Sequence, residues 1–120
     1  MRPRWVVAVA VAVAMLAAAA TPNSGKELFA KRCGGCHSPD RDKEGPRLAG
    51  VYGRRAASVK SFEYSQALSK SGVVWTADNL DKWLAGSEDM VPGTEMTYRV
   101  DSAEERREII EYLKKISPAQ

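Results

Sequence analysis

The chain has 120 residues, a length that suits one small domain. Its 18 lysine and arginine residues stand against 15 acidic residues, and two of the basic residues lie in an N-terminal segment, so the rest of the chain is close to neutral. That balance excludes the strongly basic surface on which nucleic-acid-binding domains depend.

The first twenty residues have the pattern of a secretory signal peptide. Arg2 and Arg4 form a basic start, the run that follows consists almost wholly of valine and alanine, and small residues end it. We predict a signal peptide over residues 1–20, cleaved after Ala20, and an exported, periplasmic domain over residues 21–120. The alternative is an uncleaved anchor that keeps the protein at a membrane, although the 16 residues of the run fall short of the roughly 20 that span a bilayer.

The domain is predicted to be helical. Ser24 and Glu27 form a capping-box pattern at the start of a helix that runs from about Gly25 to Cys36. Residues 38–60 are rich in proline, glycine and charged residues and follow no lasting period, so we expect a long loop that wraps around something. No segment of the domain has a convincing strand pattern.

Three further helices are expected. A short one covers about Tyr64–Ser69, and a third covers Thr76–Ala85, with Thr76 as its N-cap and Gly86 as its terminator. The last covers about Ser102–Ile116 and repeats the capping pattern at its start. The apolar faces of the third and last helices are expected to pack inward: Leu80, Trp83, Leu84, Ile109, Ile110, Leu113 and Ile116.

Residues 33–37 read Cys-Gly-Gly-Cys-His, the signature of c-type haem attachment. Positions three and four apart on a helix share a face, so both cysteines and the histidine can point at one object. The sulfurs of Cys33 and Cys36 can then add to the two vinyl groups of one haem, and His37 can be the proximal iron ligand. The two glycines allow the backbone to approach the macrocycle closely.

Three other uses of two cysteines compete with haem attachment. A disulfide within Cys-x-x-Cys closes so small a loop that it stabilises little through loop entropy. A thioredoxin-like redox pair normally follows a strand and opens a helix, whereas this pair lies at the end of a predicted helix. A structural zinc ion needs four ligands, and the domain offers two cysteines and one histidine.

His37 is the only histidine, so a second imidazole cannot fill the other axial position of a haem iron. Methionine, lysine, tyrosine or an open position remain as alternatives. Met90 follows a helix end and is by default a packing residue. Pro92 and Gly93 form a turn that can present Met96 inward, so the residues favour Met96.

A group of short segments matches a known family in order and spacing: Gly45–Arg54, Tyr64–Ser65, Ser71–Trp75, Leu80–Leu84, Val91–Met96 and Ile109–Leu113. Together with residues 33–37 they resemble the class I c-type cytochromes of the mitochondrial-like or cytochrome c2-like branch, over essentially the whole domain. The resemblance implies an all-α fold, in which a small single domain of about four helices wraps around one covalent haem. It also implies that the first and last helices cross in close contact.

The resemblance also implies roles for single residues. Haem c would be attached through Cys33 and Cys36, and its iron would be held by His37 and Met96. Pro46 would accept a hydrogen bond from the imidazole and so orient the ring. The remaining side chains near the cofactor would be Trp83 by the axial sulfur and Arg54, Tyr64 and Trp75 by the propionates.

With both axial positions filled, the iron has no open site for a substrate, so the protein is not expected to be an enzyme. We expect a one-electron carrier of a respiratory chain, a monomer or small subunit that moves electrons between periplasmic or membrane-bound redox partner proteins. The alternatives are a haem-based sensor or peroxidase-like enzyme with a displaceable methionine, a small haem subunit of a periplasmic dehydrogenase, and a dithiol–disulfide protein without haem.

The sequence departs from the family around the predicted methionine loop. Ser87 stands where the family usually has proline, so the third helix is expected to end less sharply. Glu88, Asp89 and Glu95 stand where mitochondrial members carry the lysines that dock acidic partners. The mitochondrial oxidase is therefore not expected as a partner, and a partner with a basic docking surface is expected instead.

Overall fold

A computed structural model describes residues 2–13 and 24–118. Residues 2–13 have no helix or strand and expose their apolar side chains, as with Trp5. The predicted cleavage point after Ala20 lies outside the described residues. Within the described part of the chain, every helix is too short or too polar to cross a membrane.

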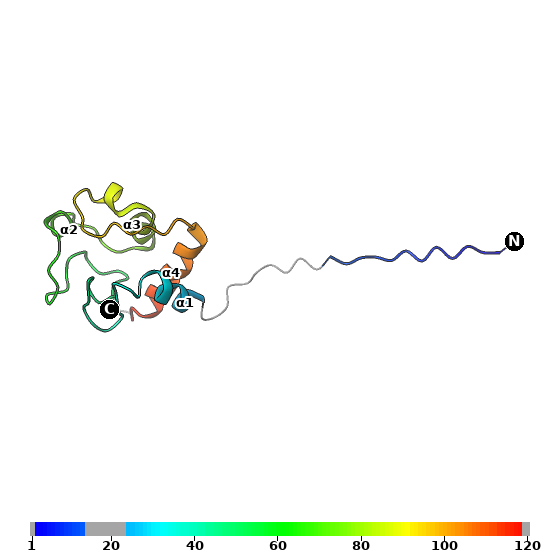
Figure 1. The fold of residues 1–120 in the computed structure, drawn as a ribbon, viewed down its shortest axis with the longest axis horizontal. Helices are drawn as coiled ribbons and strands as arrows, with labels where there is room; N and C mark the ends of the chain where they lie inside the picture. Colours follow the sequence, from blue (N-terminus) through cyan, green and yellow to red (C-terminus); the bar gives the residue numbers. More distant parts are fainter. Residues whose placement is uncertain (1, 14–23, 119–120) are drawn as a thin grey trace.

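Four helices make up the regular structure of the described residues: α1 (Ser24–Arg32), α2 (Gln66–Lys70), α3 (Ala77–Met90) and α4 (Ala103–Lys115). Long loops join them (Figure 1). In residues 24–118 the only strand-like pairing is a single bridge between Arg55 and Val74. The predicted all-α class is therefore confirmed.

Side-chain caps explain where three of the helices begin. The Thr76 hydroxyl accepts a hydrogen bond from the Asn79 amide, and the Ser102 hydroxyl accepts one from the Glu105 amide, both at 3.2 Å. Ser65 caps α2 in the same way. Each cap satisfies an amide that has no partner inside its helix, and replacing such a residue with alanine typically costs about 1 kcal/mol. The predicted caps at Thr76 and Ser102 are confirmed.

Two predicted helix ends were wrong. The first helix ends at Arg32 instead of Cys36. The Cys33 amide still makes the helical bond to the Phe29 carbonyl at 2.8 Å, but the Gly34 amide bonds to the same carbonyl at 2.9 Å and so leaves the helical pattern. A bond to the carbonyl five residues back is typical of helix C-termini, and the two glycines at this point disfavour another helical turn. The motif therefore lies in a turn that continues from the helix.

The third helix does not stop at Ala85. It kinks at Gly86, where φ is −177° and ψ is 80°, and then makes one more turn to Met90. The turn closes with a 2.8 Å hydrogen bond from the Val91 amide to the Ser87 carbonyl. Residues 87–90, which follow the terminator predicted at Gly86, are thus helical.

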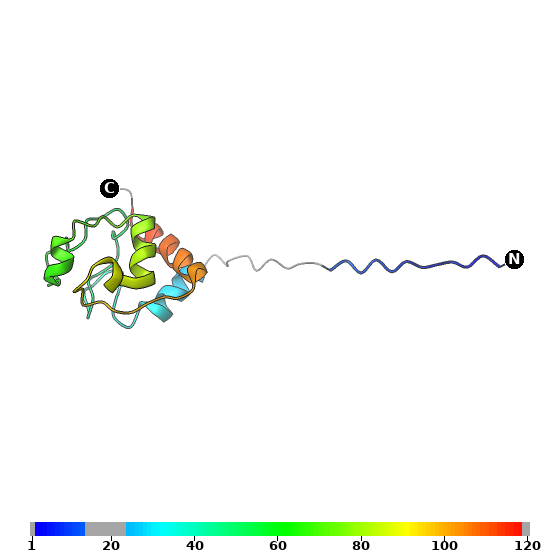
Figure 2. The same ribbon diagram turned by 90° about the horizontal axis from the view of Figure 1, so that it is seen from above.

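The core forms where α1 and α3 pack against α4 (Figures 1 and 2). The Phe29 and Tyr112 rings meet with their centroids 5.2 Å apart. At the crossing, a Cβ atom on Gly25 would lie 2.5 Å from the Glu108 carbonyl oxygen, so only glycine allows the two backbones to come this close. The close crossing of the first and last helices agrees with what the family resemblance implied.

An ion pair joins the same two helices beside this crossing. The Arg32 guanidinium donates to both Glu105 carboxylate oxygens, at 3.0 and 3.2 Å. This hydrogen bonding is the main cause that holds the pKa of Glu105 below its usual value of 4.5. The stabilisation is therefore complete above that pH and is lost as the pH falls through the lower pKa of the folded state.

We expect Glu105→Gln to lower the melting temperature at neutral pH and to converge with the parent protein in acid. Melting curves measured between pH 7 and pH 3 check this. Glu104→Gln is the matched control, because the contact of Glu104 with Arg107 is exposed and 3.9 Å long. If the two variants followed the same pH profile, the Arg32–Glu105 pair would not contribute the pH dependence.

Candidate cofactor site

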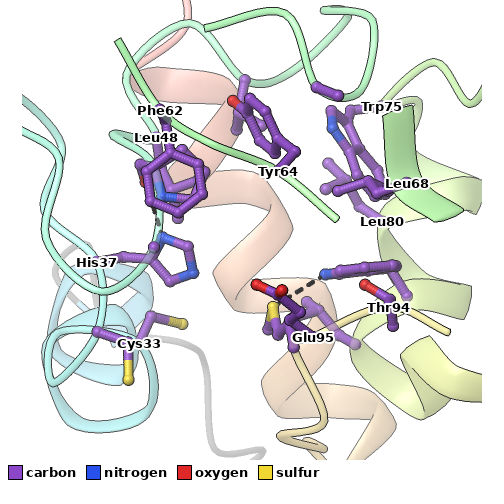
Figure 3. A pocket seen from close by; sticks show the side chains of 18 of the residues that line it. Cys33, His37, Leu48, Phe62, Tyr64, Leu68, Trp75, Leu80, Thr94 and Glu95 are labelled. Atoms are coloured by element: carbon purple, nitrogen blue, oxygen red, sulfur yellow. Dashed lines mark hydrogen bonds between the residues drawn. The ribbon is translucent and has the colours of Figure 1, made fainter. Parts of the chain in front are cut away.

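A cavity of about 360 Å³ lies between the helices and the loop that follows the Cys-x-x-Cys-His motif (Figure 3). Its volume falls in the range of about 300–1,000 Å³ that is usual for cofactor sites. Most of its wall is apolar and comes from distant parts of the chain: Leu48, Val51, Leu68, Trp75, Leu80, Trp83, Leu84, Ile109 and Leu113. The four predicted site residues line the same cavity: Cys33, Cys36, His37 and Met96.

His37 points into the cavity and is held from behind (Figure 3). Its Nδ1 atom lies 2.8 Å from the Pro46 carbonyl oxygen, the contact that the resemblance implied. When Nδ1 donates this hydrogen bond, Nε2 keeps its lone pair for a metal ion. Burial lowers the pKa of the imidazole, and the Pro46 bond opposes that shift. The surroundings therefore favour the neutral form that ligates metals.

Gly45 supports the same ring from one side. A Cβ atom at this position would collide with His37 Cε1 and lie 2.7 Å from Nδ1. Gly45 does not have a positive φ, so backbone conformation does not require glycine here. Glycine is required because a side chain would clash with the His37 ring. The loop before Pro46 can thus pack directly on the imidazole and leave the ring one orientation.

We expect Gly45→Ala to displace the His37 ring and to lower the melting temperature of the holoprotein by roughly 5–15 °C, because overpacking costs about 1–3 kcal/mol and each kcal/mol shifts a domain of this size by several degrees. Thermal melts followed by absorption of the bound cofactor check this. Arg41→Ala is the control, an exposed change in the same loop. Equal losses in both variants would contradict the steric argument.

The two thiols lie at one edge of the cavity and are not joined by a disulfide. Cys33 is half-buried, and burial, with a smaller effect of Cys36, raises its pKa to about 11. Cys36 is exposed and donates to a Glu44 carboxylate oxygen at 3.4 Å. Among the described residues, no three histidine, cysteine or acidic side chains gather as a metal cluster. The arrangement supports neither the disulfide nor the zinc alternative.

Met96 lines the cavity together with its chain neighbour Glu95. Figure 3 shows Glu95 and Thr94 across the cavity from His37. The Trp83 indole N–H donates to the Met96 sulfur at 3.2 Å, so Trp83 stands beside that sulfur as the resemblance implied. A thioether sulfur has a second lone pair that this contact leaves free. Met90 packs against the core and does not line the cavity.

The three residues expected near the propionates also line the cavity: Arg54, Tyr64 and Trp75. The Arg54 guanidinium donates to the carbonyls of Ala49 and Arg47, at 3.3 and 3.2 Å. Burial is the main cause that lowers the Arg54 pKa. The Tyr64 hydroxyl accepts a hydrogen bond from the Val59 amide at 3.3 Å. These contacts brace the loop on the cavity side.

Several wall residues were not singled out from the sequence. Phe62 and Thr94 line the cavity from loops that have no periodic pattern, and Glu44 stands at the thiol edge. Ser87, noted only as a departure from the family, is almost completely buried behind Met96. The one available signal for Ser87 was a small polar residue directly after the uncharged run Trp83–Gly86.

The donor set fits a flat, largely apolar metal macrocycle. One imidazole and one thioether line the cavity, two free thiols stand at its edge, and apolar side chains form most of the wall. Histidine and methionine are established axial ligands of haem iron. The residues present therefore fit a haem attached through two thioether bonds.

Comparison with known proteins gives consistent matches. The sequence model of the family described as cytochrome c matches residues 23–117. Cytochrome c2 of Rhodopila globiformis is 42% identical over 95 residues, which cover 77% of this chain and 90% of the relative. Cytochrome c type-1 of Ascaris suum is 40% identical over 93 residues, covering 75% and 83%. The solved structure of cytochrome cH from Methylobacterium extorquens superposes with a TM-score of 0.72 at 36% identity, covering 76% of this chain and 94% of that one.

Proposed function

Because this chain belongs to the cytochrome c family, as a class I c-type cytochrome that carries covalent haem c with its iron, we propose that it moves single electrons by means of one haem with His37 and Met96 as axial ligands. The thioether bonds would be made by Cys33 and Cys36. Proteins of this family are electron carriers and not enzymes, and the fully ligated iron proposed here gives a substrate no place to bind. The proposal rests on one observation: the His37 ring and the Met96 sulfur line the same apolar cavity.

The bound haem supplies a reversible one-electron change between ferrous and ferric iron. His37 and Met96 would hold that iron, and other residues of the chain fix the positions of these two side chains. Pro46 orients His37 through the hydrogen bond at Nδ1, and Trp83 orients the Met96 sulfur through its indole N–H. Two ligands fixed from behind need little rearrangement when the charge on the iron changes, which suits rapid electron transfer.

The same residues favour a raised reduction potential. A methionine ligand raises the potential. The apolar wall from α3 and α4, including Leu84 and Ile109, keeps water away from the site and disfavours the additional positive charge of the ferric state. The carrier is therefore expected to accept electrons readily from donors of lower potential.

The first test is an absorption spectrum of the holoprotein, made in a host that exports it and attaches haem, in the oxidised state and then reduced under carbon monoxide. We expect a low-spin covalent haem that ignores carbon monoxide. Ready carbon monoxide binding would overturn the ligation by Met96 and favour the sensor or peroxidase-like enzyme. A protein without haem, with two thiols that react in a free-thiol titration, would favour the dithiol protein.

The place of action follows from the N-terminal segment. We propose cleavage after Ala20 and release of residues 21–120 to the periplasm, where the protein works as a monomer or as a small subunit beside respiratory or dehydrogenase partners. The mass of the purified holoprotein tests this directly. A mass that includes residues 1–20 would favour the membrane-anchored alternative.

The proposed partners carry a basic docking surface. Glu88 and Asp89 are exposed at the end of α3, and Glu95 is exposed at the cavity beside Met96. Complementary charges speed the association of two proteins, and added salt shortens the range over which these charges attract. A basic partner would be drawn to the loop that carries Met96, chiefly by Glu88 and Glu95, because the Asp89 carboxylate already pairs with Arg99 at 3.5 Å.

We expect electron transfer to a cationic metal complex to slow as ionic strength rises, and transfer to an anionic complex to quicken. Stopped-flow rates at several salt concentrations check this. Glu95→Lys should weaken the salt dependence toward the cationic complex, whereas Glu111→Lys, an exposed change on α4, is the control. A parent protein whose rate with the cationic complex stays flat or rises with salt would contradict an acidic docking face.

A further inference from the structure

Ser87 is a buried polar residue whose role the proposed function does not yet use. Its side chain is 1% exposed. Its hydroxyl donates to the backbone carbonyl of Met96 at 2.5 Å. A buried hydroxyl without a hydrogen-bond partner would destabilise the fold. The bond therefore keeps the end of α3, which carries Ser87, next to the backbone of Met96.

The bond spans a short unit of chain that ends at Met96. The Val91 amide bonds to the Ser87 carbonyl at 2.8 Å, and the Thr94 amide bonds to the Val91 carbonyl at 3.1 Å. These bonds fold residues 87–94 back on themselves. The Ser87 hydroxyl then closes the unit by reaching Met96, nine residues along the chain. The last turn of α3 and the methionine loop therefore hold each other in place.

Met96 is thus anchored at two points by groups of different kinds. Ser87 holds its backbone carbonyl, and Trp83 holds its sulfur at 3.2 Å. Trp83 lies before the kink at Gly86 and Ser87 directly after it, so the two anchors reach Met96 from the two sides of the kink in α3. Loss of the backbone anchor would leave the sulfur held only by a hydrogen bond to a weak acceptor.

We propose that Ser87 is a positioning residue that keeps the Met96 sulfur on the iron; this inference rests on the His37/Met96 ligation proposed above. A proline, which the family usually has at this position, has no hydroxyl with which to make the contact. The segment from residue 85 to residue 101 contains no lysine and no histidine. If the Met96 sulfur leaves the iron, its own loop has no amine or imidazole to replace it. The vacated position on the iron is then open to an added ligand.

The test is a titration of the oxidised holoprotein with imidazole, followed by absorption. Ser87→Ala should bind imidazole about tenfold more tightly than the parent protein, a change that corresponds to about 1.4 kcal/mol. Ser117→Ala is the matched control, because the Ser117 hydroxyl also donates to a backbone carbonyl, that of Leu113 at 2.7 Å, but at the end of α4. The control should lose stability without a change in imidazole affinity.

Equal imidazole affinity in Ser87→Ala and the parent protein would overturn the proposal. If Ser87→Ala fails to accumulate with haem, the pair Ser87→Thr and Ser87→Val answers the same question, because these side chains are alike in shape and differ by the hydroxyl. Ser87→Val should then bind imidazole more tightly than Ser87→Thr, and equal affinities would overturn the proposal. A parent protein that already binds carbon monoxide would instead overturn the ligation by Met96, which distinguishes the two failures.

Discussion

Replacing both Cys33 and Cys36 with alanine should yield a chain that no longer folds cooperatively. The two thiols stand at the edge of a cavity of about 360 Å³ at the centre of the helices. At about 24 cal/mol per Å³, an empty cavity of that volume costs on the order of 9 kcal/mol. The whole stability of a small domain is about 5–15 kcal/mol, so the fold without its cofactor would be close to unstable.

Circular dichroism and thermal melting of the purified double variant test this expectation. The unchanged chain made in a host that cannot attach haem is the control, and it should be equally unfolded, because the missing cofactor and not the missing thiols removes the stability. A cooperative thermal transition in either haem-free protein would show that the helices form a sufficient core by themselves. The cofactor would then contribute little to the stability of the fold, contrary to the estimate above.

Replacing Met96 with alanine should open the sixth position of the iron. The reduced variant is expected to bind carbon monoxide, whereas the parent protein is expected not to bind it. Its potential should fall by on the order of 0.1 V, a fraction of the roughly 0.8 V over which axial ligands tune haem proteins. Absorption under carbon monoxide and a redox titration measure the two effects.

Met90→Ala is the matched control for Met96→Ala. Met90 lies six residues earlier, packs against the core and does not line the cavity. Truncation of the Met90 side chain should lower the free energy of unfolding by no more than about 5 kcal/mol, the upper end for packed side chains. The carbon monoxide response should stay unchanged. A variant pair in which Met90→Ala opened the site and Met96→Ala did not would reverse the proposed assignment.

Much of the fold could be predicted because its signals are local. Thr76 and Ser102 cap their helices through hydrogen bonds to amides three residues ahead, and that relation is visible in the sequence. The apolar spacing of the last helix likewise placed Ile109 and Leu113 in the core. The cofactor could be inferred from residues 33–37 because the attachment chemistry itself requires two thiols and an imidazole at adjacent positions.

Helix ends were predicted less well, because they depend on which carbonyl a turning amide can reach. The end of α1 at Arg32 follows from two amides that share the Phe29 carbonyl. The continuation of α3 beyond Gly86 follows from the burial of Ser87 and its bond to Met96. Helix propensity alone does not decide either end. The glycines after Arg32 favour a turn without specifying which carbonyl the amides reach, and Ser87 bonds to Met96 nine residues away.

The amino-acid sequence by itself determined the all-α class, the two best helix starts and the kind of cofactor, because each depends on residues within a few positions of one another. Only the tertiary structure decided how the site is supported. Gly45 packs on His37, Trp83 reaches the Met96 sulfur and Ser87 holds the Met96 carbonyl. These contacts join residues 8 to 13 positions apart through the folded chain, and side chains at such separations meet only when burial of the apolar faces has set the path of the backbone.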